Sequence, residues 1–95
     1  MVHILATVNI EDLQKFISVF STQGAAARRK HGSLRSQVFT VPDQAGQVRV
    51  LFEWTSREAF EGFLNDMEVR TTMQSSGTIG RPEFVFLDAF AELPG

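Results

Sequence analysis

The side chains that could carry out chemistry are few, and their types exclude several kinds of active site. The chain contains no cysteine and only two histidines, His3 and His31. The lack of cysteine excludes disulfides, iron–sulfur clusters, cysteine-ligated zinc and thiol nucleophiles, and we expect no metal site. His3 lies in an apolar segment, where it could act as a base in a pocket or be a structural histidine. His31 precedes Gly32 at an expected helix end, where its simplest role is to interact with the helix dipole.

Aromatic and methionine side chains form a second group, because such side chains suit a pocket for a flat aromatic ligand. The residues with this potential are Phe16, Phe20, Phe60, Phe63, Met67 and Met73. The same residues could instead pack as a closed core. Trp54 stands at an expected strand end, where it could stack on a substrate or pack against a helix. Arg70 follows Phe63 by seven residues, about two helical turns, so it could pair with a carboxylate or phenolate of a ligand or be a solvated surface residue.

Length and charge restrict the class of protein. The 95 residues suffice for one domain, which we expect to span residues 1–95. Nine Lys and Arg against eleven Asp and Glu give a net charge of −2, so the basic character of a nucleic-acid-binding protein is missing. The N-terminal segment lacks a basic region, and no apolar run approaches the ~18 residues of a membrane span. We therefore expect a cytoplasmic protein that binds neither nucleic acid nor membranes.

The elements that must position these side chains follow from the spacing of the apolar residues. Asn9 is the expected N-cap of the first helix. Thr55 and Glu58 form a capping-box pattern at the start of the second helix, which we expect to break near Asn65. Residues 77–80 are expected to form a mobile connection over the pocket mouth. The expected elements are a strand over 2–8, a helix over 10–30, strands over 34–41 and 48–54 joined by a turn, a helix over 56–73, and a strand over 83–92.

This β-α-β-β-α-β order is typical of the α+β, ferredoxin-like fold, in which both helices cover one face of a four-stranded antiparallel sheet. The last strand is apolar on both faces, with Phe84, Phe86 and Phe90 on one and Val85, Leu87, Ala89 and Ala91 on the other. Because the helices can cover only one face, we expect the open face to pack against a second copy of the chain, which gives a homodimeric α+β barrel. Arg49 and Glu53 share a face of the third strand and could pair in or beside that interface.

Two segments resemble a known family. Residues 48–66, VRVLFEWTSREAFEGFLND, are similar to the strand–helix signature of the antibiotic biosynthesis monooxygenase family, within the dimeric α+β barrel superfamily. In that signature a strand ending in Glu-x-Trp runs into a Ser-capped amphipathic helix, here Glu53, Trp54 and Ser56. Residues 31–39, HGSLRSQVF, resemble the glycine turn into the second strand of the family. The resemblance implies the same fold over the whole chain.

The resemblance also implies a range of activities. The family and its relatives include cofactor-independent oxygenases of polycyclic phenols and quinols, haem-degrading monooxygenases, and barrels that cyclise or isomerise small molecules, with the pocket between helices and sheet. An Asn near the position of Asn9 hydrogen-bonds substrate or oxygen-derived intermediates in several members, which makes Asn9 a candidate catalytic residue. At three positions where active relatives carry functional side chains, this chain has Phe63, Val69 and Met73. The missing imidazoles argue against haem ligation and cyclase chemistry.

Two hypotheses follow. The first is a small homodimer that binds an apolar, aromatic molecule and acts as a cofactor-independent monooxygenase, in which Asn9, Trp54, Phe63 and Arg70 line the site. The protein would then supply a dry pocket, orientation and hydrogen bonds to the developing anion. The alternative is a non-catalytic ligand-binding or structural dimer whose pocket is filled by its own Phe and Met side chains. Haem degradation is a third and more distant reading.

Overall fold

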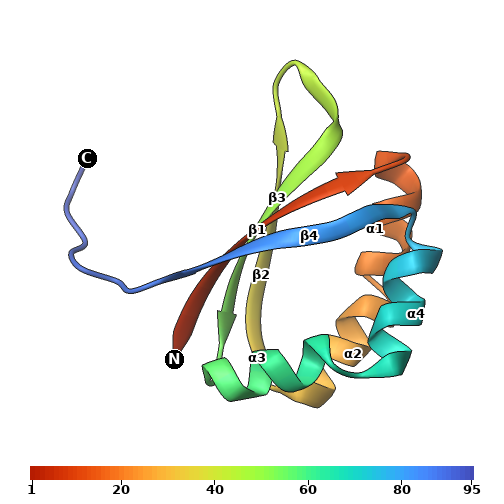
Figure 1. Cartoon of the computed structure of the whole chain (residues 1–95). Coiled ribbons are helices and arrows are strands. Elements are labelled where there is room, and N and C mark those ends of the chain that lie inside the picture. The colour runs from red at the N-terminus through yellow and green to blue at the C-terminus, as the bar shows by residue number, and fades with distance from the viewer.

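The chain folds into four strands and four short helices in a computed structural model that describes residues 1–95. The elements are β1 (Val2–Ile10), α1 (Leu13–Phe20), α2 (Gln23–His31), β2 (Ser33–Val41), β3 (Gln44–Trp54), α3 (Arg57–Leu64), α4 (Met67–Ser75) and β4 (Thr78–Leu87). The strands form one antiparallel sheet in the order β2–β3–β1–β4, and the helices lie on one side of it (Figure 1). This is the expected ferredoxin-like α+β fold, with each helical segment divided in two. None of the helices is long and apolar enough to cross a membrane.

The hydrophobic core lies between the sheet and the helices. From Ile4 onward in β1 and from Val48 onward in β3, every second residue faces the helices and is at most 6% exposed; these residues are Ile4, Ala6, Val8, Ile10, Val48, Val50, Phe52 and Trp54. Phe16, Phe60, Phe63 and Val69 meet them from the helices. Removing one of the Val, Ile or Phe side chains of this set from water contributes about 1.5–3 kcal/mol to stability, so this layer is the main source of folding free energy.

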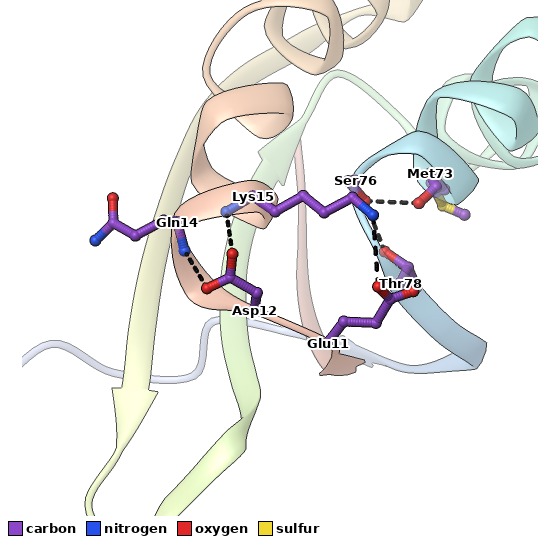
Figure 2. Close-up of polar contacts among 7 residues, drawn as sticks. All are labelled: Glu11, Asp12, Gln14, Lys15, Met73, Ser76 and Thr78. Carbon is purple, nitrogen blue, oxygen red and sulfur yellow. Dashed lines mark hydrogen bonds and ion pairs between the residues drawn. The ribbon is translucent and has the colours of Figure 1, made fainter.

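The first helix begins later than expected. Asn9 is not its N-cap, because β1 continues to Ile10, whose side chain is buried in the core. Asp12 caps α1 instead, and its carboxylate accepts hydrogen bonds from the backbone N–H groups of Gln14 and Lys15, both at 3.3 Å (Figure 2). Burial of the Ile10 side chain keeps Asn9 within β1, and this outweighs the preference of Asn for the N-cap position of a helix.

The single helix expected over residues 10–30 is two helices, α1 and α2. At the break, the hydroxyl groups of Ser21 and Thr22 donate to the carbonyl oxygens of Ile17 and Ser18, each at 2.7 Å. Such local hydrogen bonds compete with the helical ladder and explain why the chain turns there. Gly32 ends α2 with a φ of 108°, in the left-handed region, at the helix end that the sequence predicts.

The last two helices, α3 and α4, begin close to where the sequence predicts, but the residue that caps α3 differs from the one expected. Ser56, rather than Thr55, caps α3, and its Oγ accepts from the N–H of Ala59 at 3.0 Å. A Ser cap is what the family resemblance implies. The break near Asn65 is confirmed, since Asp66 caps α4.

The β2–β3 hairpin is longer than expected. Its strands run up to Val41 and on from Gln44, so only Pro42 and Asp43 form the turn. Asp43 has a φ of 68°, a left-handed conformation that Asp tolerates better than most residues. The hairpin tip projects beyond the neighbouring strands (Figure 1).

The prediction for the last strand is wrong at both ends. β4 runs from Thr78 to Leu87, because it pairs along nearly the whole length of β1. Residues 77–80 are therefore not a mobile connection, since three of the four belong to β4. Phe90 lies beyond the strand in the C-terminal tail, where it is fully exposed.

The turn between α4 and β4 is held by several hydrogen bonds. The backbone N–H of Glu11 donates to the carbonyl oxygen of Gly77 at 3.0 Å, which ties this turn to the start of α1. The Ser76 hydroxyl bonds the carbonyl oxygen of Met73 at 2.6 Å and lies 2.9 Å from the Thr78 hydroxyl (Figure 2). The turn thus positions the end of α4 against the sheet.

The face of the sheet away from the helices, here called the open face, is covered by no part of the chain (Figure 1). As expected, Phe84 and Phe86 of β4 pack toward the helices and their neighbour Val85 points to the open face, where it is 52% exposed. The expected Arg49–Glu53 pair is absent. Arg49 instead donates to the Gln47 side chain at 3.1 Å, and Glu53 pairs with a histidine of β1.

Gly32 allows a direct test of the α2–β2 junction. A Cβ at this residue would lie 2.7 Å from the Thr55 Oγ1 and would have to adopt a left-handed φ. We expect Gly32→Ala to lower the free energy of unfolding by about 1–2 kcal/mol in urea denaturation. The control is Gly62→Ala within α3, where a Cβ meets nothing within 4 Å. It is expected to raise stability by up to about 1 kcal/mol, and equal effects of the two substitutions would contradict the assignment.

Candidate functional site

An apolar cavity of about 70 Å³ lies between the helices and the sheet. Its floor is made by β1 and β3, where Ala6 and Val50 face the helices, and its walls come from all four helices. Five of the six expected Phe and Met residues line it: Phe16, Phe20, Phe60, Phe63 and Met73. Small side chains make this space, since Ala6 in the floor and Gly24 and Ala27 in α2 do not fill it.

One lining residue carries a charge. Arg28 of α2 is only 8% exposed, and no carboxylate lies within ion-pair distance of it. Its Nη1 donates to the carbonyl oxygen of Phe20 at 3.0 Å, and its Cζ lies 3.7 Å from the centre of the Phe20 ring. Burial, assisted by repulsion from Arg29, lowers the pKa of Arg28 to about 10. The surface of the cavity is nevertheless almost entirely apolar, so Arg28 is one of its lining residues without giving it a polar wall.

The burial of Arg28 is not expected from its place in the last turn of α2, where a basic side chain complements the helix dipole. A signal was nonetheless present. Gly24 and Ala27 belong to the buried stripe of the helix, and Arg28 follows Gly24 by four residues, so it lies on the same face. A basic residue in phase with a buried stripe is a candidate for a buried cation.

An open groove of about 530 Å³ runs between α4 and β4 beside the cavity. Both spaces are lined by five shared residues, Leu64, Met73, Thr78, Pro82 and Phe84. Arg70, an expected binding residue, lines the groove together with Arg81. The Arg70 Nε donates to the carbonyl oxygen of Leu64 at 3.2 Å, which holds its side chain along the groove.

Three expected site residues line neither the cavity nor the groove. Asn9 lies on the open face of the sheet, where its side-chain oxygen accepts from Gln47 at 3.2 Å. Trp54 is completely buried and packs against the rings of Phe60 and Phe63, at centroid distances of 5.2 and 5.0 Å. Met67 is 72% exposed on α4. The structure thus gathers the predicted Phe residues and Met73 at the cavity, and it places Met67, Asn9 and Trp54 away from it.

Neither histidine reaches the cavity. His3 lies 3.3 Å from the Glu53 carboxylate across β1 and β3. The His31 ring stacks edge-on against Phe63 and donates from Nε2 to the Oδ2 of Asp66 at 2.8 Å. This hydrogen bond, with that from the backbone N–H of Glu68, lowers the pKa of the Asp66 carboxyl. The pair joins the end of α2 to the start of α4. No group of three or more His, Asp or Glu side chains is placed to hold a metal ion.

Comparisons with known proteins agree with this fold. The family model described as antibiotic biosynthesis monooxygenase matches residues 1–75. SnoaB from Streptomyces nogalater, described as a cofactor-independent oxygenase, superposes with a TM-score of 0.77 at 20% identity, over 99% of this chain and 97% of that chain. No curated protein matches the sequence.

Two further solved structures, both provisionally assigned as antibiotic biosynthesis monooxygenases, share the fold. The Caulobacter crescentus protein has a TM-score of 0.74 at 20% identity, over 95% of this chain and 90% of that chain. The Deinococcus radiodurans protein has a TM-score of 0.67 at 15% identity, over 99% of this chain and 97% of that chain. At these identities the likeness establishes the fold.

The His31–Asp66 pair predicts an acid dependence of stability. Because the pKa of Asp66 is lower in the folded state, its contribution is complete above its unfolded pKa of about 3.9 and is lost as the pH falls through the folded value. Asp66→Asn is therefore expected to be less stable than the unsubstituted protein at neutral pH, and the difference should shrink below about pH 4. Urea denaturation from pH 3 to 7 measures it. Asp88→Asn in the exposed tail is the control, and a pH-independent difference for Asp66→Asn would contradict the role of the pair.

Proposed function

Because the chain belongs to the antibiotic biosynthesis monooxygenase family, we propose that it is a homodimeric, cofactor-independent oxygenase of an apolar, aromatic small molecule. The observation that carries this proposal is the apolar cavity between helices and sheet, with Phe16, Phe20, Phe63 and Met73 in its lining. SnoaB, of the same fold, is described as a cofactor-independent oxygenase, which supports the choice of reaction class.

In such a reaction the substrate itself is the reductant. An electron-rich aromatic anion passes electrons to dioxygen, one oxygen atom becomes bonded to a substrate carbon, and the other leaves as water; a ring methylene is thereby oxidised to a carbonyl. The protein side chains do not change their oxidation state. Their contribution is to exclude water, to orient the ring and to stabilise the anion that reacts.

Substrate entry requires the cavity to enlarge, since about 70 Å³ is below the ~300–1,000 Å³ typical of sites for drug-sized ligands. Met73 is placed to control this step, because it lines both the cavity and the groove. An unbranched thioether changes rotamer readily, and its displacement joins the two spaces. Arg70 would then meet the outer part of the ligand in the groove.

The small volume also supports the second candidate, a non-catalytic dimer whose pocket is closed by its own side chains. Aromatic contacts are dense at the cavity, for example between Phe16 and Phe20 at a centroid distance of 5.1 Å. Haem degradation finds less support, since neither His3 nor His31 lines the cavity.

Dimerisation through the open face is part of the proposal. This face carries apolar side chains in the central strands and β4, with Leu5 paired to Leu51 on one side and to Val85 on the other. Beside them, Asn9, Gln47 and Arg49 form a hydrogen-bonded row, and the Nε of Arg49 is buried without a partner. A second copy would cover the apolar side chains and could supply an acceptor for Arg49. We assign Asn9 to this interface.

Oxygen consumption tests the activity. Uptake above the autoxidation rate is expected with anthrone-like or quinol substrates. Thr72→Leu, which fills the cavity, should reduce uptake at least about tenfold, whereas Thr71→Leu, the same change at an exposed position of α4, should not. Asn9→Ala is expected to keep the rate.

The two candidate functions separate on ligand binding. Saturable binding of a hydrophobic fluorescent probe that Thr72→Leu abolishes would support a pocket even without turnover. The absence of both binding and oxygen uptake would leave the closed, non-catalytic dimer.

Sedimentation tests the dimer. The chain is expected to sediment at about twice 10.6 kDa. Val85→Lys, which places a charge on the open face, should weaken association by at least about tenfold, because an unpaired charge would be desolvated at the interface. The control is Ile17→Lys, which also replaces an apolar side chain by a charged one but lies on α1, away from the open face. Ile17 is 37% exposed, and this substitution should leave the dimer intact. A monomeric unsubstituted protein would contradict this part of the proposal.

A further inference from the structure

The groove between α4 and β4 gathers positive charge without negative charge. Its lining includes Arg70 of α4 and Arg81 of β4 but no Asp or Glu, although the whole chain has a net charge of −2. Neither arginine takes part in any ion pair of the structure. A hollow lined by charges of one sign raises the local concentration of the opposite charge, so this groove attracts anions.

The Arg70 side chain is fixed at its inner end. Its Nε donates to the carbonyl oxygen of Leu64, the last residue of α3, at 3.2 Å. Its two Nη groups make no hydrogen bond within the chain, so they remain available to a ligand. Because one donor already holds the side chain along the groove, less side-chain freedom is lost when the other donors bind.

Arg81 lies in an irregular part of β4. Thr7 of β1 pairs with Glu83 of β4. Two residues further along β1, Asn9 pairs with Ile79, which is four residues from Glu83 along β4. The extra residues of β4 form a β-bulge that contains Arg81, and such bulges change the direction of a side chain. The bulge therefore accounts for the place of Arg81 in the lining of the groove.

The glycine in this bulge serves the backbone conformation. Gly80 has a φ of 69°, in the left-handed region that residues with a side chain rarely adopt. A Cβ at Gly80 would meet nothing within 4 Å, so space is not the reason for a glycine here. A solvated surface arginine needs no such backbone. The local structure is thus suited to holding the neighbouring Arg81 at the groove.

The remainder of the groove lining is largely apolar, and this restricts the kind of anion that fits. Leu64, Met73 and Phe84 belong to it. A small hydrophilic anion would leave these side chains facing water, whereas an apolar chain or ring attached to the anionic group would cover them. The guanidinium group offers parallel N–H donors that match the two oxygens of a carboxylate.

Beyond the oxygenase function, we propose that this groove is a binding site for apolar carboxylic acids. The carboxylate accepts hydrogen bonds from Arg70 and Arg81, and the apolar body lies along Leu64, Met73 and Phe84. No covalent bond forms or breaks. The site is outside the cavity, and its occupation does not require the cavity to enlarge or the chain to consume oxygen.

The test compares octanoate with 1-octanol, which has the same chain length and no charge, by isothermal titration calorimetry at neutral pH. Octanoate is expected to bind at least about tenfold more tightly than 1-octanol. Its affinity should fall when the salt concentration is raised from about 20 to about 200 mM, because both arginines are exposed and their charges are screened. Inorganic phosphate at the concentration of octanoate should not displace it.

Substitutions locate the binding site. Arg70→Gln and Arg81→Gln should each lower the affinity for octanoate at least about fivefold and leave that for 1-octanol within about twofold. The matched control is Arg29→Gln, which removes the same charge from an exposed position of α2 and should have no effect. Thr72→Leu fills the cavity but not the groove, so it should also bind octanoate normally. Circular dichroism checks that each variant is folded.

Each contrary result overturns the proposal. Such results are the absence of octanoate binding, equal affinities for octanoate and 1-octanol, or an unchanged octanoate affinity in both arginine variants. Loss of binding in Thr72→Leu would place octanoate in the cavity, and displacement by phosphate would show an unselective anion site. The oxygen assay fails or succeeds separately, because Thr72→Leu is expected to lose oxygen uptake and to keep octanoate binding.

Discussion

The structure depends on the burial of one face of the two central strands. β1 and β3 pair along eight residue positions, and each presents four side chains to the helices that are nearly inaccessible to water. Since side chains alternate along a strand, this register decides on which face of the sheet each of the other side chains of β1 and β3 lies. It sends Asn9 and Arg49 to the open face, brings Trp54 under the helices, and makes the small side chain of Ala6 part of a cavity floor.

The class of fold and the order of the strands follow from the sequence, because both depend on patterns that repeat over many residues. The alternation in residues 48–54 and the helical stripes of the two α segments are examples. The residues at which helices and strands begin and end depend on single competing interactions, so they are harder to predict from the sequence. Asp12 takes the cap from Asn9 because the core needs Ile10, and β4 begins at Thr78 because β1 offers a partner that far along. Neither choice is visible without the partner strand.

The candidate site shows the same division. The Phe and Met residues of the cavity could be predicted, since apolar periodicity places them on inward faces. Arg28 could not be assigned in the same way, because a basic residue in the last turn of a helix already has a sufficient local explanation in the dipole. Its burial is decided by the break after Phe20, which frees a carbonyl group, and by the missing side chain at Gly24. These two features lie on either side of a helix break that the sequence pattern does not reveal.

The division of the helical layer into four pieces has a consequence for the cost of opening the molecule. Each of the four helices has only eight or nine residues, and α4 contacts the rest of the chain mainly through α2, α3 and β4. Such a piece can detach as a local unfolding unit at a free energy below that of global unfolding, while the sheet stays paired. Exchange of the amide hydrogens of α4 with solvent is then separable from that of β1 and β3, because the two regions would open at different free energies.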